Sequence, residues 1–211
     1  METPEPGPRY HESNPWFGNG SAAIYRAMLR YLRPSRIIEI GSGFSTAVAL
    51  DEVDAVPGLA GLEITCVEPY PQRLLALLRS SDHVRLLRCP VQEVPLEAFE
   101  KLGAGDILFI DSSHVAKAGS DVTWLLLRVL PRLAPGVAVH LHDIHWPFTY
   151  PADWLQERRD WNEAYFLHAF LSGNADWEIL LFASWLWHQH ADMLPARIAD
   201  GPSGSIWLRK K

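Results

Sequence analysis

The chain has 211 residues, a formal net charge of -6 and only two cysteines, Cys66 and Cys89. This length suits one α/β domain, and the negative charge argues against the positive field on which binding to nucleic acid or anionic lipid depends. The sequence has no signal-like apolar start and no apolar run of about 20 residues. We therefore expect a cytoplasmic protein without nucleic-acid or membrane partners, whose cysteines are free and buried.

The beginning of the chain is rich in proline, and residues 1–13 are expected to form a flexible segment ahead of a single domain over 14–211. The first predicted element of that domain is a helix over 22–32, where apolar residues recur at helical spacing. Pro34 follows directly and ends this helix.

A short β-rich run over 36–40 stops at Gly41-Ser42-Gly43, and helical spacing resumes over 45–53. A strand, a glycine turn and a helix in this order are typical of the opening of a nucleotide-binding α/β unit. The sequence therefore predicts a ligand crevice at the end of the first strand.

Apolar runs and helical segments then alternate along the chain. Five strands separated by helices predict a parallel sheet with both faces covered. The four further strands of this kind are expected over 64–68, 84–89, 106–111 and 137–143, and the helices over 72–80, 96–102 and 119–133. Two later strand-like runs, 177–182 and 205–209, have no evident crossover helix between them, which predicts an antiparallel terminal pair.

The glycine turn and one acidic residue together indicate a nucleotide ligand. Gly41 and Gly43 lack a Cβ, so the main chain can approach a ligand closely, and the next helix directs its N–H groups into the crevice. Glu68, which follows about 25 residues later, can accept both hydroxyls of a ribose. A dinucleotide dehydrogenase would also fit, although Thr46 stands where its fingerprint has a third glycine.

The motif at 39–46, Glu-Ile-Gly-Ser-Gly-Phe-Ser-Thr, resembles motif I of class I S-adenosylmethionine-dependent methyltransferases. Residues 14–17, 109–114, 142–145 and 161–163 are similar to a bacterial branch of methyltransferases grouped with small O-methyltransferases of sugar and natural-product pathways. This resemblance extends over almost the whole chain. It implies a Rossmann-like seven-stranded sheet, mostly parallel with an antiparallel last strand, and S-adenosyl-L-methionine as the cofactor.

The resemblance also implies where the cofactor would lie. Glu39 would contact its methionine part through the loop, Glu68 would bind the ribose, and the turn at 91–93 would border the adenine. The cofactor-binding residues predicted in this way are Glu39, Gly41, Ser42, Gly43, Ser45, Glu68, Gln92, Asp111 and Ser112.

Two carboxylates and three histidines are expected near the same crevice. Asp111 and Asp143 each end a strand, and the ends of neighbouring parallel strands open onto one edge of the sheet. Histidine is the natural base for a hydroxyl or amine, so His114, His142 and His145 are the candidate catalytic residues. By resemblance, His114 matches the base position of the sugar O-methyltransferases.

The metal-dependent relatives have an acid at the end of the fourth strand and one or two ligands at the end of the fifth. By this resemblance, Asp111, His142 and Asp143 are the predicted ligands of a divalent ion such as Mg, Mn, Fe or Zn. A hydrogen-bonded polar cluster without a metal is the alternative. The proline-rich residues 146–151 are expected to form a loop over this crevice.

The expected function is methylation of a small molecule, on oxygen, by a cytoplasmic S-adenosylmethionine-dependent enzyme that could form a homo-oligomer. Two other functions stay open at this point. The same glycine loop would serve an NAD(P)-dependent oxidoreductase, and a non-catalytic protein could keep the fold only to bind S-adenosylmethionine.

Overall fold

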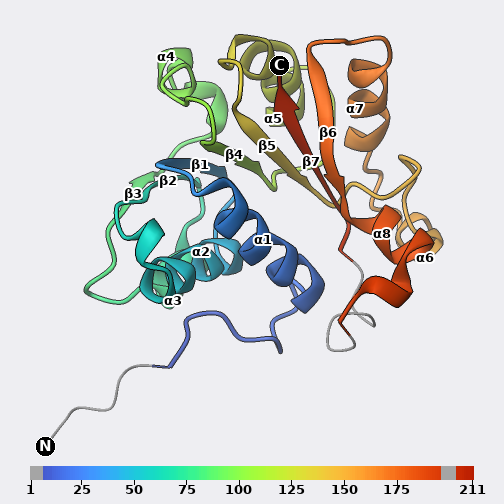
Figure 1. Cartoon of the computed structure of the whole chain (residues 1–211). Helices are drawn as coiled ribbons and strands as arrows, with labels where there is room; N and C mark the ends of the chain where they lie inside the picture. Colours follow the sequence, from blue (N-terminus) through green and yellow to red (C-terminus); the bar gives the residue numbers. More distant parts are fainter. Residues whose placement is uncertain (1–6, 196–202) are drawn as a thin grey trace, which may run out of the picture.

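The computed structural model describes residues 7–195 and 203–211. Its centre is a seven-stranded sheet with the order β3-β2-β1-β4-β5-β7-β6 (Figure 1). Strands β1 to β5 are parallel where they pair, and β7 is antiparallel to both of its neighbours, β5 and β6. The predicted Rossmann-like sheet with an antiparallel last strand is therefore confirmed.

All seven predicted strands are present, and their ends differ from the prediction by no more than two residues. The strands are β1 Arg36–Ile40, β2 Glu63–Val67, β3 Val84–Leu87, β4 Ile107–Ile110, β5 Ala138–His142, β6 Trp177–Phe182 and β7 Ser205–Lys210. Glu68, Asp111 and Asp143 were predicted as the last residues of their strands, but each lies just beyond the strand. These polar residues therefore occupy the carboxyl edge of the sheet.

Helices cover both faces of the sheet, as Figure 1 shows. On one face lie α1 Asn19–Leu32, α2 Phe44–Ala55 and α3 Gln72–Leu77. On the other lie α4 Leu96–Phe99, α7 Glu163–Leu171 and a continuous helical segment made of α5 Asp121–Trp124, the π-helical turn Leu125–Val129 and the 3-10 turn Leu130–Arg132.

Two short helices were not predicted. These are α6 Ala152–Gln156, which follows the loop after β5, and α8 Ala183–Gln189, which lies between β6 and β7. Three isolated 3-10 turns complete the described elements, Pro57–Leu59, Val91–Glu93 and Ala191–Met193.

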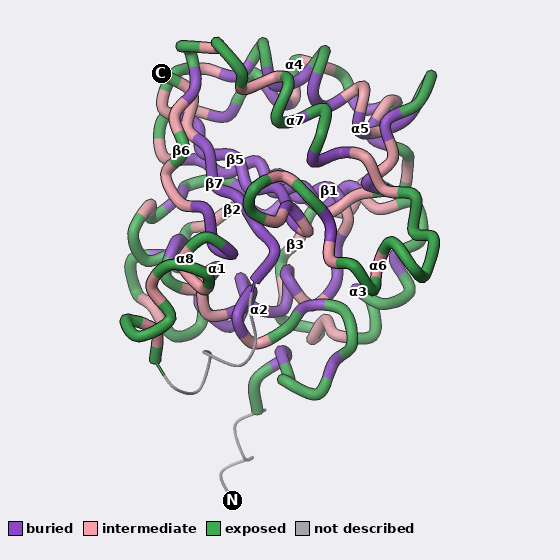
Figure 2. The backbone as a smooth tube through the Cα atoms, turned by 90° about the vertical axis from the view of Figure 1, so that its right-hand side faces the viewer, coloured by how far each residue is buried: buried purple, intermediate pink, exposed green. Residues whose placement is uncertain are grey.

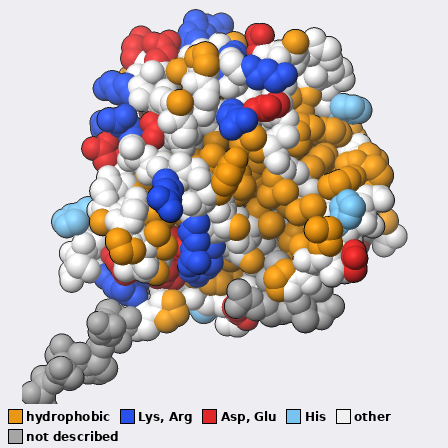
Figure 3. Space-filling model, viewed as in Figure 1, with side chains coloured by type: hydrophobic (Ala, Val, Ile, Leu, Met, Phe, Trp, Pro, Cys, Tyr) orange, Lys and Arg blue, Asp and Glu red, His pale blue; other side chains and the backbone are white. Residues whose placement is uncertain are grey.

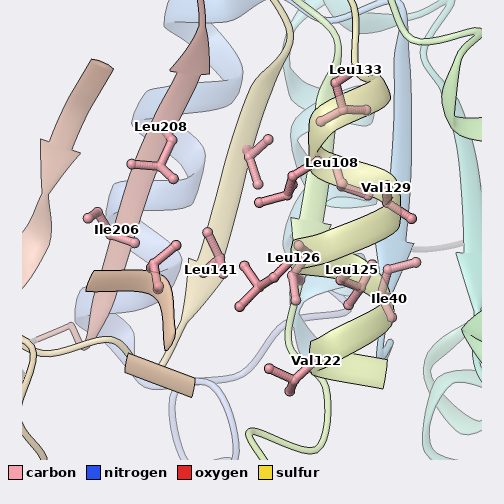
Figure 4. Packing of buried hydrophobic residues seen from close by; sticks show 14 of the residues in the cluster. Ile40, Leu108, Val122, Leu125, Leu126, Val129, Leu133, Leu141, Ile206 and Leu208 are labelled. Carbon is pink, nitrogen blue, oxygen red and sulfur yellow. The ribbon is translucent and has the colours of Figure 1, made fainter. Parts of the chain in front are cut away.

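Alternation along the strands divides the core into two layers. In β1, Ile37 packs with α1 and α2, whereas Ile38 and Ile40 pack on the opposite face. On that opposite face, Leu108 of β4 and Leu126 of the π-helical turn belong to the cluster in Figure 4. The central strands β1, β4, β5 and β7 are buried over most of their length, whereas the edge strands β3 and β6 are only partly buried (Figure 2). This alternation determines which face each strand residue of the site points to.

The amino-terminal segment is bound to the domain from Arg9 onward. The Arg9 guanidinium, of which 3% is exposed, lies 3.1 Å from Asp51 and 2.7 Å from Asp54, and it also pairs with Asp82. Tyr10 is buried beside it. The prediction of a flexible segment over 1–13 is therefore wrong for Arg9 and Tyr10, because carboxylates of α2 bind both residues. Residues 1–6 of that segment lie outside the residues that the structure describes.

Cys66 is buried, Cys89 is half-buried, and both are free thiols. None of the helices within 7–195 and 203–211 combines the length and apolar character needed to cross a membrane.

On the face seen in Figure 3, hydrophobic side chains gather over the half where α1, β6 and α8 lie. Exposed Tyr31, Ile179 and Trp185 belong to these three elements.

Candidate functional site

The glycine turn joins the ends of three strands. Gly41 donates its N–H to Val67 at 3.1 Å, and Asp111 donates to Ile40 at 2.9 Å. Gly41 has a φ of +78°, and a Cβ placed there would lie 1.8 Å from the carbonyl oxygen of Asp111. A glycine is thus required because the end of β4 passes directly against the turn.

Glu39 supports this turn from inside the protein. Its carboxylate accepts hydrogen bonds from Thr46 Oγ1 at 2.7 Å and from the Ser45 hydroxyl, and none of the residue is exposed. Burial raises the pKa of Glu39 to about 7, although these hydrogen bonds oppose the shift. Alternation in β1 points Glu39 toward α2, the face of Ile37, so the predicted contact of Glu39 with the cofactor would have to run through the glycine turn.

Glu68 lies at the rim of the turn, as predicted. One carboxylate oxygen accepts the N–H of Ser42 at 3.1 Å, and the other accepts the N–H of Tyr70 at 2.8 Å. The residue is half-buried, so its carboxylate can still meet a ligand.

Two cavities meet at this edge of the sheet, and both are lined by Gly41, Glu68 and Asp111. The smaller, of about 80 Å³, lies over the glycine turn, and Ser42, Gly43 and Ser45 also line it. The larger, of about 530 Å³, extends to Gln92 and Ser112. The structure thus brings together every predicted cofactor residue except Glu39.

Four residues of the smaller cavity were missing from the predicted site, namely Trp16, Phe17, Phe44 and Arg73. The Arg73 guanidinium lies over the Trp16 ring, 4.0 Å from its centroid. Residues 14–17 were noted only for their family resemblance, and nothing in the pattern of α3 distinguishes Arg73 from a surface arginine. Their role depends on the tertiary structure, which places the amino-terminal segment across the glycine turn.

Asp111, His114 and Asp143 form a compact cluster beside these cavities. His114 Nε2 lies 3.3 Å from Asp111 Oδ1 and 3.7 Å from Asp143 Oδ2. His114 and Asp143 both have left-handed backbones, with φ of +58° and +57°. Such conformations are uncommon outside glycine and concentrate at functional sites.

His142 lies next to this cluster but does not belong to the group of possible metal ligands, in which it was predicted. Its Nδ1 is 3.3 Å from Asp143 Oδ1 and 3.7 Å from Asp111 Oδ1, while its Nε2 shares a hydrogen bond with Ser21 Oγ at 3.1 Å. The ligand atoms that lie within 4.8 Å of one another belong to Asp111, His114 and Asp143. Among the described residues, His114 and not the predicted His142 thus completes this group of possible ligands.

His145 lies outside the cluster, and this geometry gives no support to its predicted role as a base. The chain turns at Asp143, and the Ile144 N–H binds the Gly204 carbonyl at 3.1 Å. The His145 ring consequently packs against Gly204 and edge-on to Trp154, with 5.1 Å between the ring centroids. Burial there lowers its pKa.

Opposite charges compensate one another inside the cluster. Burial opposes ionisation of Asp111, but His142 and His114 outweigh it and lower its pKa to about 2. Burial likewise disfavours charge on His142, but Asp143 and Asp111 raise its pKa to about 9. The pKa of His114 is raised against burial by Asp111 and by Glu163. Without another cation, the two rings therefore supply the positive charge that balances the carboxylates.

The donor set of Asp111, His114 and Asp143 also fits a divalent cation. Two carboxylate oxygens and one imidazole nitrogen lie within 4.8 Å of one another, and the other ring nitrogen of His114 is bound to a carboxylate, as is usual for a metal-ligating histidine. Imidazole shifts the preference from Mg toward Mn, Fe or Zn.

Comparison with known families and proteins identifies the family of this domain. Residues 38–144 match the family model of a methyltransferase domain. An uncharacterized protein of Archaeoglobus fulgidus is 38% identical over 107 residues, which are 48% of this chain and 47% of that protein. The chain thus aligns with about half the length of this curated relative.

Solved structures of low sequence identity have the same fold. An SAH-bound methyltransferase of Podospora anserina is 19% identical, with a TM-score of 0.55 and coverage of 90% of this chain and 77% of that one. An O-methyltransferase from Bacillus cereus in complex with SAH is 15% identical, with a TM-score of 0.55 and coverage of 92% and 82%. A CmcI structure described with Mg and SAM is 18% identical, with a TM-score of 0.52 and coverage of 92% and 72%.

Proposed function

The chain belongs to the methyltransferase-domain family, and we propose that it transfers a methyl group from S-adenosylmethionine to an oxygen of a small molecule. One observation carries this proposal. The cavity over the glycine turn and the carboxylate and histidine cluster share Asp111, so a cofactor and an acceptor would meet at one strand end. Methyl transfer is an in-line displacement, for which alignment of the two reactants is the main requirement.

The β1 and β2 ends would hold the cofactor. Glu68 is placed to accept the ribose hydroxyls, and Gln92 and Ser112 line the cavity that extends beyond it for the adenine. Arg73 brings a positive charge to the smaller cavity, where it would complement the carboxylate of the methionine part. Glu39 would support the cofactor indirectly, by keeping the turn in shape through Ser45.

The β4 and β5 ends would hold the acceptor. Without a metal, His114 in its neutral form would be the best-placed base, because its Nε2 faces both aspartates and its Nδ1 is held on the opposite side. Alternatively, Asp111, His114 and Asp143 would hold a divalent ion; His114 would then be a ligand through the same Nε2 and not the base, and the ion would act as a Lewis acid toward the acceptor oxygen. Asp143 and Asp111 would otherwise orient the acceptor hydroxyl by accepting its hydrogen bond.

Calorimetric titration with S-adenosylhomocysteine (SAH) tests the cofactor half. We expect micromolar binding of SAH and no heat from NAD or NADP; the opposite preference would contradict the proposal and favour an oxidoreductase. Transfer of a labelled methyl group from S-adenosylmethionine to a fractionated metabolite extract then tests catalysis, and binding without transfer to any fraction would favour a non-catalytic binding protein.

Chelation tests the metal half of the proposal. If a metal takes part, dialysis against EDTA should abolish methyl transfer, and added Mn²⁺ or Mg²⁺ should restore it. Methyl transfer by Asp143→Asn should also be strongly impaired. Transfer that survives both EDTA and Asp143→Asn would rule out metal assistance and leave His114 as a metal-free base.

A further inference from the structure

The first turn of α7 is fastened to the loop that carries His114, about 50 residues earlier in the chain. The N–H groups of Asn162 and Glu163 both donate to the His114 carbonyl, at 3.1 and 3.2 Å. The Asn162 side chain accepts the Ala116 N–H at 2.6 Å and donates to the Ala116 carbonyl at 3.2 Å. This clamp holds the left-handed backbone at His114 in place.

The same turn of helix also fixes the His114 ring. Glu163 Oε2 lies 2.9 Å from His114 Nδ1, and the glutamate is only 1% exposed. The Trp161 ring packs against the imidazole, with 4.3 Å between the centroids. With Nδ1 bound to a carboxylate, the other ring nitrogen, Nε2, can point only toward the two aspartates.

We propose that Glu163 is the positioning residue of His114, holding a proton on Nδ1 so that Nε2 is presented to Asp111 and Asp143. A buried carboxylate hydrogen-bonded to a histidine fixes both the tautomer and the orientation of the ring. This arrangement serves a base and a metal ligand equally, because each uses Nε2. The inference rests on the proposed function, in which His114 is the working ring.

Three variants separate the parts of this role. Glu163→Gln keeps a hydrogen-bond acceptor of the same size but removes the charge, and Glu163→Ala removes both. Glu97→Gln removes a charge from an exposed position on α4 and serves as the matched control. Circular dichroism and thermal unfolding establish that each variant is folded, and Glu163→Gln keeps the test available if Glu163→Ala does not fold.

Titration with Mn²⁺ alone and with SAH alone gives the first readout. We expect Glu163→Ala to weaken Mn²⁺ binding about 10- to 100-fold, the usual effect of losing a carboxylate behind a histidine ligand. Glu163→Gln should have a smaller effect in the same direction, and Glu97→Gln none. SAH affinity should stay unchanged in all three, since Glu163 lines neither cofactor cavity. Unchanged Mn²⁺ affinity in both folded Glu163 variants would overturn the proposal.

Nuclear magnetic resonance of ¹⁵N-histidine protein gives a readout that needs neither metal nor substrate. His114 should show a downfield resonance from a strongly hydrogen-bonded Nδ1 proton, which is assigned by its loss in His114→Gln. This resonance should disappear in Glu163→Ala and persist in Glu97→Gln. Absence of that resonance from the wild type, or its persistence in Glu163→Ala, would overturn the role of Glu163. Failure of the wild type to bind SAH would instead refute the proposed function.

Discussion

At the scale of single residues, Gly41 shows a glycine that is required by the protein rather than by a ligand. Gly41→Ala should lower the free energy of unfolding by about 1–3 kcal/mol, because the Cβ would collide with the Asp111 carbonyl and φ is +78°. Gly173→Ala is the matched control, since its φ is +74° but a Cβ would meet no atom within 4 Å. Urea unfolding measures both, and equal losses would show that the contact with Asp111 is unimportant.

Glu68 provides a test of the cofactor cavity itself. Glu68→Ala should weaken SAH binding by about 1.5–3 kcal/mol, the scale of hydrogen bonds to a charged acceptor, which is roughly 10- to 100-fold in the dissociation constant. Glu63→Ala, at the opposite end of β2, should have no effect. Isothermal titration calorimetry with SAH measures the affinity of both variants. A negligible loss in Glu68→Ala would mean that the ribose lies elsewhere.

Single residues also show where sequence information stops. Asp111 and Asp143 could be placed at the site because each directly follows a recognisable strand. The sequence also predicts where the Glu39 side chain points, since alternation along the strand puts it on the same face as Ile37. The motif resemblance led us instead to predict a contact with the cofactor. That His145 would lie outside the cluster depended on the left-handed turn at Asp143, which no local pattern indicates.

At the scale of elements, the strands were predictable because each contains a short apolar run, which is nearly continuous in the buried parallel strands β4 and β5. Helices α6 and α8 are short, and their boundaries depend on contacts with the rest of the fold. The attachment of the segment at Arg9 was not predictable either. It requires carboxylates from α2 and from the turn after α3, which are 42 and 73 residues away.

This attachment predicts an acid-dependent loss of stability. Although burial opposes the shift, the hydrogen bonds of Arg9 lower the pKa of Asp82 below its usual value. The carboxylate therefore stabilises the fold fully above its unfolded pKa of about 4, and this contribution is lost as the pH falls from there through the lowered folded pKa.

Asp82→Asn tests this contribution. The variant should be less stable than the wild type at pH 7, by about 1–3 kcal/mol, and the difference should shrink as the pH falls below about 4. Urea unfolding between pH 3 and pH 7 measures it. Glu97→Gln, on exposed α4, is the control and should follow the wild type. A pH-independent difference would show that Asp82 acts through packing and not through its charge.

At the scale of the whole molecule, one edge of one sheet carries both halves of the proposed site. The smaller cavity is lined from the ends of β1, β2 and β4, from the start of α3 and from the segment before α1. The cavity exists only when all of these elements are assembled. A cofactor bound there must therefore stabilise the folded state as a whole.

The corresponding prediction is a rise in melting temperature with ligand. At an SAH concentration about 100 times the dissociation constant, binding to the folded state alone adds about 2.7 kcal/mol. For a domain of this size that is about 5–10 °C in the unfolding midpoint. NAD at the same concentration should give no shift, and Glu68→Ala should need roughly 10- to 100-fold more SAH to reach the same midpoint.

Because the cavity spans the amino-terminal segment and three strands, the shift should appear equally in far-ultraviolet circular dichroism and in tryptophan fluorescence. A shift in only one of these signals would mean that the ligand stabilises one part of the fold, contrary to the assembly seen here.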